Sequence, residues 1–237
     1  MNCQEILNRL QAEASETYKS NVVRMGIPEE YSIGVSTATV RSLAKEIPKS
    51  KELAYELWHT GYHEARLLAV LLFDKKSFTL EEADSLMSDV ISWDLCDHLC
   101  KNLVVKLKDY QSLIGQWVDA SQTYKKRGAF TLMASSAIHD KKISDETLDD
   151  YLGLIREYSA AEQEHVKKAV SWALREIGKR DFTYNEKALL LAYELKESKD
   201  KSQLWIAKDA IKELENLVKV EGRSRLISAS SRMGQNV

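Results

Sequence analysis

Turn-forming residues are scarce in this chain, and their scarcity limits the folds that it can adopt. The 237 residues include nine glycines and only two prolines, Pro28 and Pro48. Proline and glycine are the strongest helix breakers, and sheets need frequent turns. The sequence therefore predicts an all-α protein, in which long helices follow one another almost without interruption after residue 48.

Apolar residues recur at intervals of three and four, which is the spacing of one helix face. Near the start, this spacing indicates an amphipathic helix over residues 3–20, with Ile6, Leu7, Leu10 and Ala14 on one face. A loop follows, and Ser36–Thr37 is expected to cap a helix that turns Val40, Leu43, Ala44 and Ile47 inward. Further helices are expected near residues 51–59, 63–73, 80–91, 94–107, 110–120, 124–138, 145–157, 162–179, 186–195 and 201–219.

A short pattern, a basic residue followed by small and aliphatic ones, recurs along the chain. It is found at Glu64–Ala69, Lys126–Phe130, Val166–Val170 and Leu204–Ala210. The last three copies are roughly 40 residues apart, the period of HEAT-type helix pairs. We therefore expect an α-α superhelix of HEAT-like repeats, a single domain over residues 1–220 that forms a curved solenoid with a concave groove. The recurring Arg66, Arg127, Lys168 and Lys208 would project along this groove, although any one of them alone can equally be an ordinary solvated charge.

The composition changes after Val220. Residues 221–237 are rich in serine, arginine and glycine, which is typical of a flexible tail. Arg223, Arg225 and Arg232 would be able to touch a phosphate backbone, but a tail without a role is the simpler interpretation.

Bulk properties exclude several classes of protein. No apolar run reaches the roughly 18 residues that a membrane span requires. The three cysteines are few, and an odd number of them cannot all pair, which argues against a secreted disulfide framework. We expect a cytoplasmic protein with no membrane contact. The formal net charge of −2 argues against a uniformly basic nucleic-acid binder, yet the 34 lysines and arginines can still form a local basic groove.

The segment Ser92–His98 is the most informative for chemistry. Trp93 and Asp97 are four residues apart and share one face of a helix that begins near Ser92. Asp94 is expected in the first turn of this helix, where its charge favours the helix N-terminus and its role is structural.

A metal site is not expected among the nearby cysteines. Cys96 and Cys100 share a helix face while His98 points away, so that one ion could not bind all three, and buried apolar cysteines are the better interpretation. No glycine-rich phosphate loop is present either, and no cofactor is expected.

Spacing alone would assign all five tryptophans to the core. Trp58, Trp117 and Trp205 are expected there, and on the same argument Trp93 and Trp172 would be core residues too. An aspartate four residues after a tryptophan is likewise most often a capping or solvated group.

A family resemblance changes that expectation. Three segments resemble, in order, the motifs of the AlkD-like DNA alkylation repair family. They are Ser92-Trp93-Asp94 with Asp97, then Lys126–Ala129, and then Lys167–Glu176. Tyr31–Val35 and Val40–Ile47 extend the resemblance, which covers roughly residues 30–215.

The resemblance implies a DNA glycosylase that excises purines alkylated at N3 or N7 from double-stranded DNA. It implies that Asp97, Trp93 and Trp172 line the lesion site, that Arg127 braces nearby DNA, and that the base need not be turned fully into a pocket. A monomer is expected. Two alternatives remain open: a HEAT-repeat protein that binds distorted or branched DNA without excision, and a protein-binding scaffold.

Overall fold

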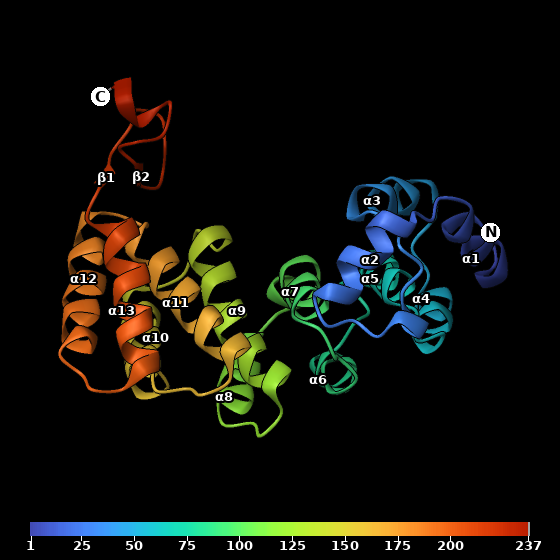
Figure 1. Cartoon of the computed structure of the whole chain (residues 1–237), viewed down its shortest axis with the longest axis horizontal. Coiled ribbons are helices and arrows are strands. Elements are labelled where there is room, and N and C mark those ends of the chain that lie inside the picture. Colours follow the sequence, from blue (N-terminus) through green and yellow to red (C-terminus); the bar gives the residue numbers. More distant parts are fainter. Residues whose placement is uncertain (237) are drawn as a thin grey trace. The chain divides into compact units, whose positions relative to one another are not determined.

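The computed structural model describes residues 1–236, and its regular structure is almost entirely helical (Figure 1). This confirms the all-α prediction. The helices of the described chain are α1 (Cys3–Ala12), α2 (Glu16–Arg24), α3 (Thr37–Glu46), α4 (Lys51–His59), α5 (His63–Leu72), α6 (Leu80–Ser88), α7 (Trp93–Asn102), α8 (Gln111–Val118), α9 (Thr123–His139), α10 (Asp145–Glu157), α11 (Glu164–Gly178), α12 (Phe182–Lys196) and α13 (Lys201–Leu214). Three short 3-10 turns, η1 (Glu29–Tyr31), η2 (Val104–Lys106) and η3 (Gly234–Asn236), and two short strands, β1 (Leu217–Val218) and β2 (Ile227–Ser228), complete them.

The helices form two compact units, which meet in sequence at Tyr110 and Gln111. Unit 1 contains α1 to α7, and unit 2 begins with α8. The grouping of residues 1–220 into one domain stays a prediction.

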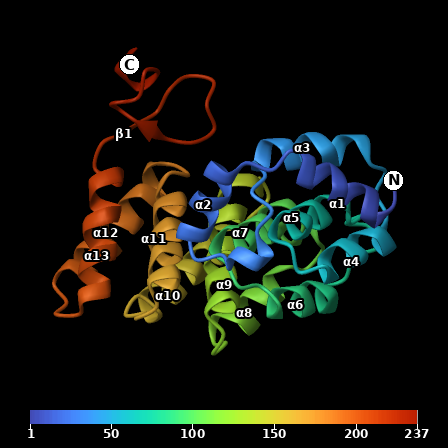
Figure 2. The same cartoon turned by 45° about the vertical axis from the view of Figure 1, so that its right-hand side comes forward.

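In unit 1, several contacts between helices join residues that are the same distance apart in the chain. The helices α3, α5 and α7 pack one beside the next, and α4 packs on α5; Figure 2 shows α1 next to α3 and α4. Trp58 donates a hydrogen bond to Asp89, His63 contacts Asp94, and His98 contacts Leu67, and each of these pairs is 31 residues apart.

Unit 2 has a longer repeat. The helices α9, α11 and α13 pack in order, as do α10 and α12. Polar contacts between successive pairs join residues 38 apart, as in Arg156 with Glu194, Lys187 with Asp149 and Ser171 with Asp209. This step agrees with the repeat of roughly 40 residues that the sequence predicts for this half.

A buried glutamate fixes the loop before α3 to α5. The Glu64 carboxylate is 1% exposed and accepts backbone N–H groups from Ile33, Gly34 and Val35 at 2.9, 2.7 and 3.1 Å. Gly34 has φ +92°, and a Cβ there would lie 2.8 Å from the carbonyl oxygen of Ser15, so that no other residue fits without displacement. The loop motif Ile33–Val35 and the α5 motif are therefore one structural feature.

Several helix boundaries differ from the prediction. Residues 3–20 form two helices instead of one, because Ser15 caps a new helix by accepting the N–H of Tyr18, and its own N–H bonds to Gly34. The helix predicted over 94–107 ends at Asn102 and gives way to η2. The helix predicted over 186–195 begins earlier, at Phe182, because Asp181 caps it.

Two of the three tryptophans assigned to the core are buried, and the third is not. Trp58 and Trp117 are 0% and 1% exposed, as predicted. Trp205 is 36% exposed, so its assignment to the core was wrong. It lies on α13, the last helix of unit 2, and its ring contacts the ammonium of Lys167 at 5.0 Å.

After α13, the described chain continues through Asn236 with β1, β2 and η3. Helix α13 ends at Leu214, short of the predicted residue 219, and β1 then pairs antiparallel with β2, with Leu217 opposite Ser228. Leu226 is 2% exposed, and its N–H bonds to the carbonyl of Lys179. Val237, the last residue of the predicted flexible tail, lies outside the described residues. Within the described part of the chain, no helix is both long enough and apolar enough to cross a membrane.

Candidate functional site

An open hollow of about 180 Å³ lies where α3, α5 and α7 run side by side in unit 1. Two of the predicted site residues, Trp93 and Asp97, line it together. The other lining residues are Thr37 and Arg41 of α3, Leu67 of α5, and Asp94, His98, Lys101 and Asn102 of α7.

The helical spacing of α7 explains this grouping. The helix begins at Trp93, with Ser92 as its N-cap, so that Trp93, Asp97 and Lys101 stack one turn above another on the same face. Asp97 is 9% exposed and Trp93 is half-buried. Cys96 and Cys100 are both fully buried, as predicted.

Asp94 has a structural partner. Its carboxylate lies 2.8 Å from Nε2 of His63, a side chain that is 6% exposed. Burial alone would raise the pKa of Asp94, but the interaction with His63 and the backbone N–H of Leu95 together outweigh burial and hold this pKa below its ordinary value. Asp94 also lies in the first turn of α7, where the sequence predicts it.

The imidazole of His98 is neutral at physiological pH. Burial and the nearby positive charge of Arg41 lower its pKa to about 4, although the hydrogen bond to Leu67 acts in the opposite direction. Its Nε2 lies 3.0 Å from the carbonyl oxygen of Leu67, and because a carbonyl only accepts, the proton of the neutral ring is on Nε2. The hollow therefore carries the charges of Arg41, Lys101, Asp94 and Asp97, and none from His98.

Trp172 and Arg127 belong to unit 2. The half-buried indole of Trp172 donates its N–H to Oε1 of Glu176 at 3.1 Å. Arg127 is 6% exposed and donates to the carbonyl of His165 at 2.7 Å, which joins α9 to α11. The structure thus brings Trp93 and Asp97 together in one unit, and it describes Trp172 and Arg127 in the other.

The four predicted DNA-contacting cations differ in their surroundings. Arg66 is half-buried; it donates to the backbone carbonyls of Trp58 and Asp89, and its guanidinium lies over the Trp58 ring at 5.2 Å. By contrast, the side chain of Lys168 is 53% exposed, and Lys208 is exposed as well. At the surface, Lys168 pairs with the carboxylate of Glu164 at 3.2 Å, whereas the two arginines donate to neighbouring backbone carbonyls.

Sequence reasoning missed Arg41, His98 and Lys101 as lining residues. The signal for Lys101 was present, because it continues the spacing of four that links Trp93 with Asp97. Arg41 had no such signal, since it reaches the hollow from α3, and only the packing of α3 on α5 brings it there.

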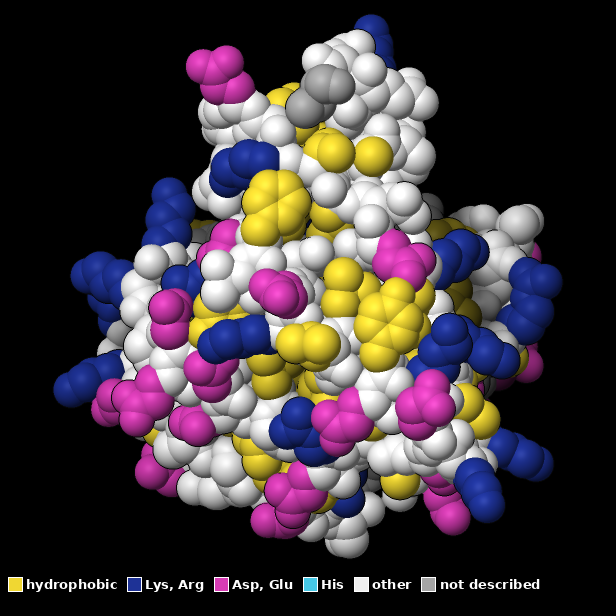
Figure 3. Space-filling model, turned by 90° about the vertical axis from the view of Figure 1, so that its left-hand side faces the viewer, with side chains coloured by type: hydrophobic (Ala, Val, Ile, Leu, Met, Phe, Trp, Pro, Cys, Tyr) yellow, Lys and Arg dark blue, Asp and Glu magenta, His cyan; other side chains and the backbone are white. Residues whose placement is uncertain are grey.

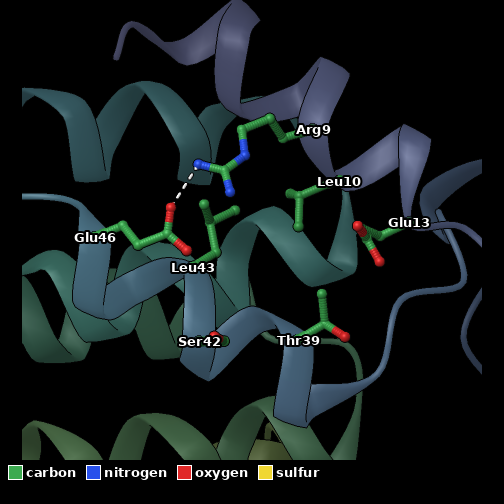
Figure 4. Close-up of a pocket in the computed structure, with 7 residues that line it drawn as sticks. All are labelled: Arg9, Leu10, Glu13, Thr39, Ser42, Leu43 and Glu46. Atoms are coloured by element: carbon green, nitrogen blue, oxygen red, sulfur yellow. Dashed lines mark hydrogen bonds and ion pairs between the residues drawn. The ribbon is translucent and has the colours of Figure 1, made fainter.

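A second hollow, of about 290 Å³, lies between α1 and α3 (Figure 4). Arg9 and Glu46 form an ion pair of 2.8 Å across it, and Glu13 lies at its edge. Because its two carboxylates outnumber its one guanidinium, this hollow repels anions. None of its lining residues belongs to the predicted site.

Comparison with known proteins supports the resemblance drawn from the motifs. Residues 6–214 match a family model described as DNA alkylation repair enzyme. None of the curated proteins matches the sequence.

Two solved structures are similar in fold. One is described as "a new family of proteins related to the HEAT-like repeat DNA glycosylases with affinity for branched DNA structures"; it is 20% identical, the match covers 100% of this chain and 94% of that one, and the TM-score is 0.75. The other is AlkD2 from Streptococcus mutans, which is 19% identical over 89% of this chain and 98% of its own, with a TM-score of 0.54. The predicted HEAT-like repeat fold is thereby confirmed.

Proposed function

Because the chain belongs to the DNA alkylation repair enzyme family, we propose that it is a DNA glycosylase that removes N3- or N7-alkylated purines from double-stranded DNA. One observation carries the proposal: Trp93 and Asp97 lie on one face of α7 and line the same open hollow. A carboxylate beside an indole ring suits the chemistry of a cationic sugar.

Alkylation at N3 or N7 gives a purine a formal positive charge, so that the base is already a good leaving group. As the C1′–N bond breaks, the base leaves with the electron pair and the positive charge moves to the deoxyribose. Asp97 would stabilise this oxocarbenium electrostatically and orient the water that adds to C1′, whose proton passes to solvent. Trp93 would hold the cationic sugar through contact with its ring face.

The open shape of the hollow suits a reaction on a base that stays outside an enclosed pocket. The hollow, of about 180 Å³, is exposed to solvent and does not surround a ligand. An enzyme that turns its target base out of the duplex needs a pocket that surrounds it. We therefore propose that the hollow receives the sugar edge of the damaged nucleotide, with Arg41 and Lys101 near the flanking phosphates.

The direct test is the release of 3-methyladenine and 7-methylguanine from methylated duplex DNA. We expect Asp97→Asn to fold and bind DNA normally but to lose about a hundredfold or more in excision rate, as when one preorganised electrostatic group is removed. Asp150→Asn is the matched control, because Asp150 is exposed on α10. Equal rates for the wild-type protein and Asp97→Asn would remove Asp97 from the mechanism.

One alternative has support of its own. The solved structure with a TM-score of 0.75 is described by its affinity for branched DNA, and the same fold here would suit a protein that binds such DNA without cutting a glycosidic bond. This alternative predicts tighter binding to a four-way junction than to a linear duplex of equal length, measured by fluorescence anisotropy, together with no base release by the wild-type protein.

A further inference from the structure

The C-terminal hairpin, residues 217–228, lies outside the proposed site. It follows α13 and begins after Leu214, where the match to the family model ends. Figure 1 shows it leaving the end of α13 in unit 2. Its contacts lead back to one of the predicted DNA-contacting side chains, Trp172.

The indole of Trp172 is held by a carboxylate that has several other partners. Oε1 of Glu176 accepts the indole N–H at 3.1 Å and the ammonium of Lys179 at 2.7 Å. Oε2 of the same carboxylate accepts the guanidinium of Arg225 at 2.7 Å. The Glu176 side chain is 12% exposed, so these hydrogen bonds are shielded from water.

Arg225 comes from the hairpin and anchors it at the ends of two helices. Besides the carboxylate, it donates to the backbone carbonyl of Glu176 at 2.7 Å and to that of Ala137. Both carbonyls lie in the last turns of their helices, α11 and α9, where backbone acceptors have no partner inside the helix. Leu226, the next residue, is buried and donates its N–H to the carbonyl of Lys179, which attaches the hairpin to the end of α11 at a second point.

The hydrogen bond from Trp172 would be weak without this support. A single side-chain contact between positions i and i+4 on a helix surface does little to fix a ring. Here Lys179 and Arg225 fix the acceptor instead, and the carboxylate then has one orientation in which to receive the indole N–H.

The charge balance around Glu176 also depends on Arg225. Three carboxylates, those of Glu176, Asp209 and Glu213, face three cations, Arg175, Lys179 and Arg225. Without Arg225, Glu176 keeps only Lys179, which Glu213 also engages at 2.7 Å.

We propose that the C-terminal hairpin orients Trp172 for DNA through Arg225 and Glu176, which makes these two residues positioning residues. The part of this proposal that concerns DNA rests on the proposed function, whereas the orientation of the indole does not. The segment expected from sequence to be a flexible tail would thus set the geometry of a DNA-contacting ring.

The test uses the full chain labelled with 5-fluorotryptophan, in which ¹⁹F NMR gives one resonance for each of the five tryptophans, and Trp172→Phe identifies that of Trp172. We expect Arg225→Gln to shift or broaden the Trp172 resonance and to leave those of Trp58 and Trp117 unchanged. Arg223→Gln is the matched control, because Arg223 lies on the same hairpin, is exposed and contacts Met233 rather than Glu176. An unchanged Trp172 resonance in Arg225→Gln, or equal changes in all five, would overturn the proposal.

A second variant and a second readout keep the test decisive. If Arg225→Gln does not fold, Glu176→Gln is judged by the same spectrum and the same criterion. Excision by the folded variant should fall about tenfold or more, as expected for a misplaced binding group, and Arg225→Lys should recover part of it through the ion pair with Glu176. If the wild-type protein releases no base, the proposed function fails, while the ¹⁹F spectrum still decides whether the hairpin orients Trp172.

Discussion

Glu64→Gln tests whether one buried carboxylate holds the loop before α3 in place. Oε1 of Glu64 accepts two N–H groups, those of Gly34 and Val35, and Oε2 accepts that of Ile33. Glutamine has nearly the same shape but only one oxygen. In its better orientation the amide oxygen replaces Oε1, and the amide NH₂ then faces the N–H of Ile33, donor against donor.

The expected cost follows from these contacts. A buried donor without a partner costs about 1–3 kcal/mol, and two hydrogen bonds that lose their charge each weaken by roughly 1 kcal/mol. Removal of a buried charge offsets part of this loss, because a charged group is costly to take out of water. We therefore expect Glu64→Gln to destabilise unit 1 by about 3 kcal/mol.

Hydrogen exchange measured by mass spectrometry gives a local readout, because amides of the loop exchange when it opens. At about 1.4 kcal/mol per factor of ten, Ile33, Gly34 and Val35 should exchange about a hundredfold faster in Glu64→Gln. Glu56→Gln is the matched control, since Glu56 is exposed on α4 of the same unit and exposed substitutions usually change stability by less than about 0.5 kcal/mol. Equal exchange in the two variants would refute the role assigned to Glu64.

Three further predictions concern other features. Because the pKa of His98 is about 4 when folded and about 6.5 when unfolded, the folded state binds fewer protons, and stability should fall as pH drops through this window. The free energy of unfolding, measured in urea, should fall by about 2 kcal/mol between pH 7 and pH 5 in the wild-type protein and should not do so in His98→Asn. Equal decreases in the two proteins would contradict the lowered pKa of His98. Gly34→Ala should lower stability by at least about 2 kcal/mol, because φ is positive and backbone lies close; an unchanged melting temperature would refute this. Replacing Lys168 and Lys208 by alanine should reduce the salt slope of duplex affinity by about two, whereas Lys187→Ala, which removes a lysine of α12 outside the recurring basic pattern, should not.

The fold was largely predictable from the sequence, because helix periodicity and breaker residues are local properties. The break after Ala12 was missed, since a cap at Ser15 competes with a helical pattern that continues through it. Trp205 was misplaced for another reason: the spacing of a tryptophan identifies a face, but not whether another helix covers that face.

The candidate site was predictable only where it lies on one helix. Trp93 and Asp97 are one turn apart, so that their spacing alone placed them together. Arg41 joins them from another helix, and Arg225 reaches Glu176 across 49 residues. Such contacts depend on tertiary packing, for which no short-range pattern exists.

The face of unit 2 that carries α12 lies at the edge of its packed helices. Phe182, Leu190 and Tyr193 are 57%, 64% and 41% exposed there, and Figure 3 views this side, where hydrophobic side chains lie among acidic and basic ones. Apolar patches of this kind favour association when they are contiguous, and here the ion pairs of Lys187 with Asp149 and of Arg156 with Glu194 interrupt the surface beside Leu190.

The two contact steps, 31 residues in unit 1 and 38 in unit 2, restrict how the length of such a chain can change. Insertion of a few residues inside a helix would change the separation of every contact pair that spans the insertion. Duplication or loss of a whole repeat would preserve all of these pairings. Each unit can thus gain or lose a whole repeat, by a length close to its own step, and keep these pairings.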